Sequence, residues 1–112
     1  MKTLALIAAA AAIATSMSAS AYAYDREARI DFRRDQQAYR IRHDRSTGEL
    51  TLLEKWRLRG EQARIARMER FALRDGYISR SEANRISAAQ DKASYDIYRD
   101  SHNGRVAWWR LW

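Results

Sequence analysis

The chain has 112 residues and a formal net charge of +7 at pH 7, with 21 Lys and Arg against 14 Asp and Glu. This length allows one domain, and the absence of cysteine from the sequence excludes a disulfide-stabilised scaffold. The two histidines, His43 and His102, lie in different segments without Ser-His-Asp or metal-ligand spacing around them. The sequence therefore predicts a protein that is not an enzyme.

The N-terminal segment predicts a cleavable secretory signal peptide. Lys2 precedes an apolar run from Leu4 to Thr15, and small residues then lead to Ala21-Tyr22-Ala23, which fits an A-x-A cleavage site. A transmembrane helix is the alternative, but it needs about 20 apolar residues, and one Thr and three Ser interrupt positions 15–20. We predict cleavage after Ala23, a domain at 24–104, a tail at 105–112, and a periplasmic or secreted location.

The remaining 89 residues are strongly basic. Lys2 is the only charged residue of segment 1–23, so the rest carries 20 basic against 14 acidic residues, a balance of +6, and nearly all the basic residues are Arg. A planar guanidinium can bind a phosphate or a carboxylate through two parallel hydrogen bonds. We expect an anionic envelope surface, or unfolded or acidic periplasmic proteins, as partners, and export makes nucleic acid an unexpected one.

The absence of proline and the small number of glycines predict three long helices. The first covers about 25–45, the second runs from after Thr51 to about Arg74, and the third runs from after Ser79 to about 102–104. Gly60, in the middle of the second helix, indicates close backbone approach or a bend. The predicted fold class is all-α: a signal peptide, an up-down-up three-helix arrangement and a Trp-rich C-terminal tail.

Apolar spacing defines the inner face of each helix. In the first helix this face holds Ile30, Arg34, Gln37 and Ile41. In the other two helices it holds Leu58, Ile65, Met68, Ala72, Ala83, Ile86, Ala89 or Gln90, Ala93 and Ile97. The opposite side of the second helix holds Arg57, Arg59, Arg64, Arg67, Arg70 and Arg74.

Two turns share the pattern G-x-[LI]-[TS]-x-x-E at an offset of 28 residues, beginning at Gly48 and Gly76. In each, the glycine can end a helix, and the Thr or Ser forms a capping box with the Glu three residues later. The pattern also resembles the second half of an EF-hand calcium loop. Carried over by position, the two loops would offer Thr51 and Glu54, and Asp75, Ser79 and Glu82, as metal ligands.

Calcium requires six to eight oxygen ligands. The first and third positions of the two loops are Phe, Leu, His and Arg instead of acidic residues. A helix stop followed by a capped helix start explains the same residues completely. We therefore expect no cofactor, and calcium binding remains the alternative.

The chain resembles a group of small exported proteobacterial proteins. The segments that carry the resemblance are STGELTLLE (46–54), QARIARMER (62–70), RDGYISRSE (74–82) and ASYDIYRDSHNG (93–104), and it extends from about Ile30 to Asn103. It implies a fold and an exported location but no reaction. The chain is also similar, more weakly, to Spy/CpxP-type periplasmic chaperones, which are small, basic and helical with repeated L-T-x-x-Q motifs. Here Glu54 and Glu82 stand where that motif has Gln.

The C-terminal tail is rich in tryptophan and arginine. Tryptophan among arginines suits a membrane interface, but the tail can instead fold back to complete a small core or bind a partner protein. Trp56 projects from the basic side of the second helix, either as an exposed platform for cation–π contacts or as a contact to another helix. The residues of the tail that we expect to take part in binding are Trp108, Trp109, Arg110 and Trp112.

These observations favour a non-catalytic periplasmic binding module, chaperone-like or envelope-associated, that uses a basic helical surface. The expected surface combines Arg57, Arg64, Arg67, Arg74 and Trp56 with the tail, which could make a peripheral membrane contact. The alternative function is a divalent-cation sensor that uses the degenerate EF-hand-like loops.

Overall fold

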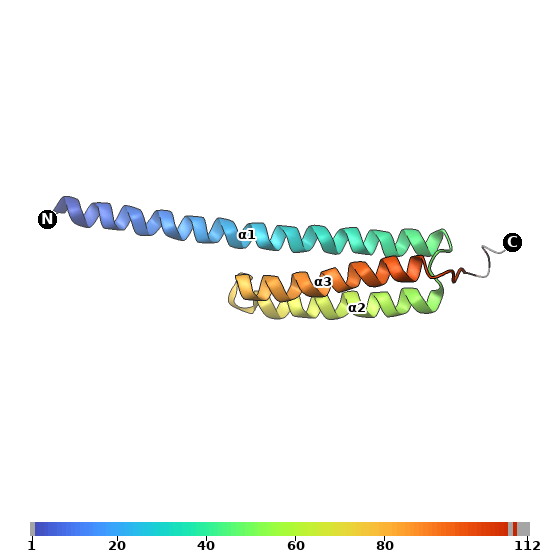
Figure 1. Cartoon of the computed structure of the whole chain (residues 1–112). Helices are drawn as coiled ribbons and strands as arrows, with labels where there is room; N and C mark the ends of the chain where they lie inside the picture. The colour runs from blue at the N-terminus through green and yellow to red at the C-terminus, as the bar shows by residue number, and fades with distance from the viewer. Residues whose placement is uncertain (1, 108, 110–112) are drawn as a thin grey trace.

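The computed structural model describes residues 2–107 and 109, with side chains from residue 21 onward. These residues form three α-helices and a short 3-10 helix: α1 (Lys2–Ser46), α2 (Leu52–Ala72), η1 (Leu73–Asp75) and α3 (Arg80–Ser101). No strand occurs among them. α1 and α3 run in the same direction and α2 runs antiparallel to both (Figure 1). The prediction of an all-α fold with three helices is confirmed.

The first helix begins earlier than predicted. α1 starts at Lys2 and therefore includes the predicted signal peptide as well as the predicted helix over 25–45. Cleavage after Ala23 stays a prediction. Within the part of the chain that the structure describes, no helix is long and apolar enough to span a membrane.

Both predicted capping boxes form, and they explain where α2 and α3 begin. Thr51 Oγ1 accepts from the Glu54 amide at 3.2 Å, and Glu54 Oε1 accepts from the Thr51 amide at 2.9 Å. Ser79 and Glu82 make the same pair of bonds, both at 3.1 Å. Each box satisfies amide groups that have no partner within the helix, which stabilises a helix start by about 1 kcal/mol.

The turns before these caps are built alike. Gly48 and Gly76 have φ angles of 83° and 98°, in the left-handed region where glycine is favoured, as predicted for helix stops. Two residues later, Leu50 and Ile78 are both fully buried. The repeat therefore places one aliphatic side chain from each turn into the core, and the turns close the two ends of the helix pairs.

The core consists of two apolar clusters. The larger one lies toward the α2–α3 turn and the smaller one toward the α1–α2 turn. The buried members of the larger cluster are Ile30, Ile65, Ala72, Ile78, Ile86 and Ala93. Those of the smaller cluster are Ile41, Leu50, Leu58 and Ile97. Most predicted inner-face positions are among them. At the position left open between Ala89 and Gln90, Gln90 is the buried residue, at 1% exposure.

Gln37 of α1 and Gln62 of α2 lie between the two clusters, and Gln90 of α3 completes a layer of glutamines with them. Gln62 Nε2 donates to Gln37 Oε1 at 2.9 Å, and Gln37 Nε2 donates to the Gln90 carbonyl at 2.8 Å and to Ser94 Oγ at 2.7 Å. Gln90 Nε2 in turn donates to the Ile30 carbonyl at 3.0 Å. The layer therefore links all three helices, and its buried members, Gln37 and Gln90, need hydrogen bonds to offset the loss of hydration.

Of the two expectations for Gly60, close backbone approach or a bend, the first is wrong. Gly60 lies on the exposed side of α2, and a Cβ built there would meet nothing within 4 Å. Arg34 also departs from the predicted inner face. Its side chain is 42% exposed, and its Nη1 reaches across to Glu69 Oε2 at 3.1 Å. A long side chain can follow the apolar edge and keep its charged group at the surface.

Candidate binding surfaces

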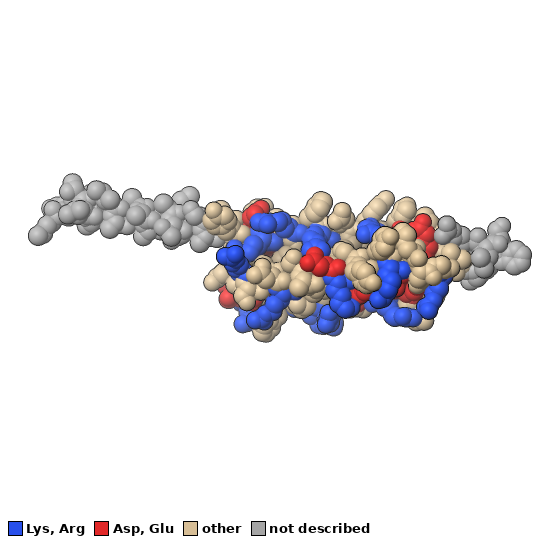
Figure 2. Space-filling view, viewed as in Figure 1, with Lys and Arg blue, Asp and Glu red and all other residues tan. Residues whose placement is uncertain are grey.

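The outward side of α2 carries five exposed arginines, Arg57, Arg59, Arg64, Arg67 and Arg70, which we call the basic face of α2. They lie opposite the buried positions of the helix, as the 3.6-residue period requires. Figure 2 shows basic side chains along the edge of the molecule where α2 lies in Figure 1.

The arginines of the basic face differ in their partners from Arg29, Arg33 and Arg34 of α1, which all lie close to carboxylates. Arg33 Nη2 lies 2.7 Å from Asp91 Oδ1, and Arg34 lies close to three carboxylates, including Glu69. Among the residues whose side chains are described, no carboxylate lies within ion-pairing distance of the five arginines on α2. Their guanidinium groups are therefore available to an external anion.

Arg74, which the sequence groups with these residues, is held locally instead. It lies in η1, where its Nη1 donates to the Phe71 carbonyl at 3.0 Å and lies 3.9 Å from Glu82 Oε2. Its guanidinium carbon lies 3.8 Å from the centroid of the Phe71 ring. Arg74 therefore contacts residues of the α2–α3 turn, although its side chain also lies at the surface.

Burial of acidic residues makes the surface more basic than the net charge suggests. Five of the fourteen acidic residues are buried, namely Asp44, Glu54, Glu69, Asp96 and Asp100. A buried carboxylate does not lie on the surface that an approaching anion contacts, whereas the exposed guanidinium groups do. The sequence did not predict this inward placement of acidic side chains.

One buried carboxyl, that of Glu69, lies between α1 and α2 beside Asp31 and Arg34. Burial, followed by a hydrogen bond with Asp31, raises the pKa of Glu69 to about 7, and the Arg34 guanidinium opposes this rise. Because two carboxyl groups that share a hydrogen bond repel each other when both are ionised, the pair holds a proton near neutral pH.

A second carboxyl pair joins α2 to α3. Burial, followed by the hydrogen bond with Asp96, raises the pKa of Glu61. Burial acts in the same direction on Asp96, but hydrogen bonds from Lys92 and Glu61 outweigh it and lower the pKa of Asp96. Lys92 Nζ lies 2.8 Å from Asp96 and 3.5 Å from Glu61, so one ammonium group bridges the two helices.

Of the residues predicted as calcium ligands, all except Asp75 form the two helix caps. Burial raises the pKa of Glu54, but hydrogen bonds from the Thr51 amide and from Asn103 Nδ2, at 2.6 Å, outweigh it and lower that pKa. The Ser79 amide and hydroxyl hydrogen bonds lower the pKa of Glu82. Asp75 is exposed in η1. Within the described residues, no group of three or more His, Cys, Asp or Glu is placed to hold a metal ion.

The ends of α1 and α3 bring a histidine, an aspartate and a serine together. Asp44 Oδ2 accepts from Ser101 Oγ at 2.7 Å, and Asp44 Oδ1 lies 3.1 Å from His43 Nδ1. In an acyl-transfer triad the imidazole lies between the hydroxyl and the carboxylate. Here the carboxylate lies between the other two groups, so the imidazole is not next to the hydroxyl. The cluster ties the C-terminal ends of the two helices together.

The two aromatic residues of the predicted surface that the structure describes, Trp56 and Trp109, lie in different places. Trp56 is 57% exposed with Lys55 Nζ 5.6 Å from its ring centroid, so it is an exposed platform. Trp109 is half-buried with the Arg45 guanidinium carbon 4.8 Å from its ring centroid. The Ala107 amide donates to the Gly48 carbonyl at 2.9 Å. The described part of the tail therefore contacts the α1–α2 turn, while Trp108, Arg110 and Trp112 lie outside the described residues.

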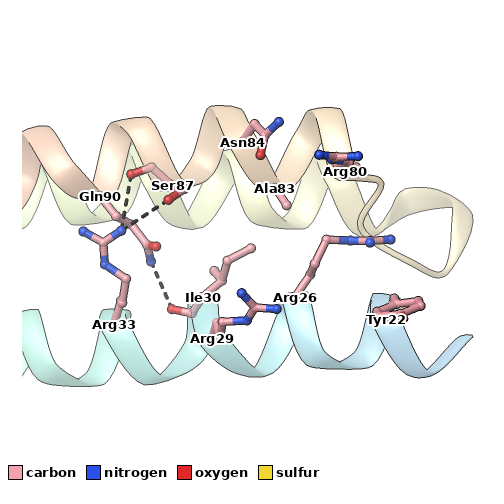
Figure 3. Close-up of a pocket in the computed structure, with 10 residues that line it drawn as sticks. All are labelled: Tyr22, Arg26, Arg29, Ile30, Arg33, Arg80, Ala83, Asn84, Ser87 and Gln90. Atoms are coloured by element: carbon pink, nitrogen blue, oxygen red, sulfur yellow. Dashed lines mark hydrogen bonds between the residues drawn. The ribbon is translucent and has the colours of Figure 1, made fainter. Parts of the chain in front are cut away.

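A groove of about 800 Å³ lies between the α1 and α3 segments on either side of Ile30 and Ala83. Arg26, Arg29 and Arg33 of α1 and Arg80 of α3 line it, together with Gln90 (Figure 3). Arg26 Nε donates to the Ile78 carbonyl at 3.1 Å, which anchors α1 to the α2–α3 turn. The sequence did not predict this groove. The spacing of Arg26, Arg29 and Arg33, at i, i+3 and i+7 on one helix face, was its only signal.

Comparison with protein-family models, curated proteins and solved structures finds no match for this chain.

Proposed function

We propose that the protein is an exported, non-catalytic binding module whose basic face of α2 binds an anionic surface of the cell envelope. The observation that carries the proposal is that five exposed arginines on one helix lack carboxylate partners among the described residues, while five acidic residues are buried. A basic residue close to an anionic lipid surface contributes about 1 kcal/mol of attraction, so five arginines supply enough for peripheral binding.

Co-sedimentation with lipid vesicles tests the proposal. The protein is expected to bind vesicles that contain phosphatidylglycerol and to leave pure phosphatidylcholine vesicles unbound. Binding should weaken steeply as salt rises, because exposed charges are screened over about 10 Å at 0.1 M salt. Equal binding to both vesicle types would contradict the proposal.

Charge variants identify the face that binds. The double variant Arg64→Gln/Arg67→Gln should weaken binding to the anionic vesicles by about 30-fold, which corresponds to about 1 kcal/mol for each arginine. The matched control, Arg40→Gln/Arg42→Gln, removes the same charge from α1. If the control weakened binding as much as the α2 variant, net charge and not the basic face of α2 would be responsible.

The tail is proposed as a second membrane contact. Tryptophan and arginine are both favourable at the level of the lipid headgroups. Deletion of residues 105–112 should then weaken binding to the anionic vesicles further, in the Arg64→Gln/Arg67→Gln background as well as in the wild type. Undiminished binding after the deletion would remove the tail from the proposal.

A chaperone-like activity is the second candidate, and the exposed aromatic side chains favour it. Trp56 is 57% exposed and Phe71 is 65% exposed on the same helix as the arginines, so apolar area and positive charge alternate there. Such a surface attracts an unfolded acidic chain and also gives its apolar side chains a contact. Suppression of the aggregation of an unfolded acidic protein, reduced by Trp56→Ser, would support this candidate. Unchanged aggregation would reject it.

A further inference from the structure

The groove between α1 and α3 holds an excess of two positive charges. It is lined by Arg26, Arg29, Arg33 and Arg80. Asp25 pairs with Arg29, and Asp91 pairs with Arg33 at 2.7 Å. No carboxylate of residues 21–107 lies within ion-pairing distance of Arg26 or Arg80. Four guanidinium groups against two carboxylates therefore leave a charge that a dianion would balance.

The groove also contains a buried polar atom without a partner. Gln90 is 1% exposed, and its Nε2 donates to the Ile30 carbonyl at 3.0 Å. The carbonyl fixes the orientation of the amide, because only a nitrogen can donate to it. Gln90 Oε1 is then the one buried side-chain nitrogen or oxygen atom of the described residues that has no hydrogen-bond partner. Figure 3 shows this oxygen on the groove side of the Gln90 amide.

An unpartnered buried amide oxygen costs about 1–3 kcal/mol relative to a satisfied one, so a donor is expected beside it. A simple inorganic anion balances the arginines but supplies no suitable donor at the other end of the groove. Arg80 and Gln90 are ten residues apart on α3, about 15 Å along the helix axis. One ligand that meets both requirements must carry an anionic group and, at a distance from it, a hydroxyl or amine.

We propose that the α1–α3 groove binds a phosphomonoester that also carries hydroxyl groups, with the chemistry of a sugar phosphate. A phosphomonoester carries a charge of about −1.5 to −2 at pH 7, which matches the excess charge of the groove, whereas a single carboxylate carries −1. The guanidinium groups of Arg26 and Arg80, at the end beside the α2–α3 turn, receive the phosphate (Figure 3). A hydroxyl donates to Gln90 Oε1.

The apolar wall and the size of the groove agree with such a ligand. Ile30 and Ala83 lie between the two polar ends and offer a surface to the C–H face of a sugar ring. A volume of about 800 Å³ lies within the range of small-molecule sites. Tyr22 also lines the groove but belongs to the predicted signal peptide, so no part of the assignment depends on it.

This site is separate from the proposed membrane-binding face of α2. It predicts saturable binding of a soluble molecule, whereas the basic face predicts binding to an extended anionic surface. The phosphorylated sugar can be free in solution or can be the headgroup of a glycolipid, since the recognised chemistry is the same.

Titration with glucose 6-phosphate, followed by NMR, tests the assignment. Inorganic phosphate and glucose serve as the two partial ligands. We expect glucose 6-phosphate to bind at least about tenfold more tightly than inorganic phosphate, because the hydroxyl contact adds to the charge-assisted bonds, and glucose to show no saturable binding. The signals that shift should include the side-chain amide of Gln90 and the side chains of Arg26 and Arg80.

Two variants and one control make the test specific. Arg80→Gln replaces an exposed side chain, so the fold should be retained, and it should weaken glucose 6-phosphate binding by about tenfold or more. Gln90→Met removes the amide oxygen and should abolish the preference for glucose 6-phosphate over inorganic phosphate. Arg64→Gln, on the basic face of α2, should change the affinity less than about twofold. Equal affinity for glucose 6-phosphate and inorganic phosphate, or an unchanged affinity in Arg80→Gln, would overturn the assignment.

Vesicles distinguish the two sources of the ligand. In phosphatidylcholine vesicles with a phosphorylated glycolipid, displacement of bound protein by free glucose 6-phosphate would support a lipid-borne ligand in the groove. Binding in solution without such displacement would support a free ligand. If neither the titration in solution nor the glycolipid vesicles showed saturable binding, the inference would be overturned. The proposed role of α2 would remain, because Arg64→Gln/Arg67→Gln tests that role separately.

Discussion

Replacement of Glu69 by glutamine should change how the stability of the bundle depends on pH. Burial and the hydrogen bond with Asp31 raise the pKa of Glu69 from 4.5 to about 7 in the folded protein. A carboxyl whose pKa is raised by folding contributes stability that is fully present below pH 4.5 and is lost as the pH rises through 7. A rise of about 2.5 pKa units corresponds to about 3 kcal/mol of unfolding free energy.

Most of this change falls between pH 5 and pH 8, because the unfolded chain has already released the proton there while the folded protein still holds it. Urea unfolding monitored by circular dichroism at pH 5, 6, 7 and 8 measures it. The unfolding free energy of the wild type should fall by about 2.5 kcal/mol over this range. Glu69→Gln keeps an oxygen that can accept from Arg34 but cannot ionise, so its unfolding free energy should fall much less.

Asp35→Asn is the matched control, because it removes one carboxylate that is 80% exposed and lies near the same arginine. Its unfolding free energy should follow the pH dependence of the wild type. A direct measurement of the Glu69 carboxyl carbon by NMR gives the pKa itself. If Glu69→Gln and the wild type lost the same unfolding free energy between pH 5 and pH 8, then Glu69 would be ionised in the folded protein and the assignment of the proton would be wrong.

Three further predictions concern the caps, the glycines and calcium. Glu54→Ala should lower the unfolding free energy by about 2 kcal/mol, because it leaves the Thr51 amide and Asn103 without their acceptor. Glu82→Ala should lower it less. Equal losses of the two variants in urea unfolding would contradict this prediction. Gly60→Ala should raise the melting temperature and increase the unfolding free energy by about 0.5–1 kcal/mol. Gly76→Ala should lower the melting temperature, because the φ angle of Gly76 is 98°. A lower melting temperature of Gly60→Ala would show that an unseen contact requires glycine there. Calorimetric titration with calcium should give no saturable heat, because the carboxylates of Glu54 and Glu82 are engaged in the caps. Saturable heat that disappears in Glu54→Gln/Glu82→Gln would instead support the cation sensor.

The features that could be predicted from the sequence are those determined by neighbours in the chain. A capping box needs only Thr51 and Glu54, three residues apart, and the left-handed turns need only Gly48 and Gly76. Both were predicted at the correct residues. Helical periodicity likewise placed Leu58 and the other core aliphatics, because burial repeats every 3.6 residues whatever the partner helix is.

The features that could not be predicted depend on how one helix faces another. Arg26 meets the Ile78 carbonyl 52 residues away, and Arg33 meets Asp91 58 residues away, so the groove exists only in the assembled bundle. Burial of Glu69 depends on Asp31 and Arg34 lying across the α1–α2 interface. The sequence around a polar residue at an inner-face position does not identify the residue that it contacts on another helix. The pattern of a single helix therefore does not predict such contacts.

The glutamine layer connects the fold to the groove through the register of the helices. Gln37 can satisfy its amide only where Gln62, Ser94 and the Gln90 carbonyl lie at the same level. A slip of α1 by one turn, about 5.4 Å, would move Gln37 against aliphatic side chains and leave several buried polar groups unpaired, at about 1–3 kcal/mol each. The two apolar clusters alone would tolerate such a slip better, because aliphatic contacts are not directional. By fixing this level, the layer also fixes Arg26 opposite the α2–α3 turn, and the charge of the groove therefore depends on an uncharged layer in the core.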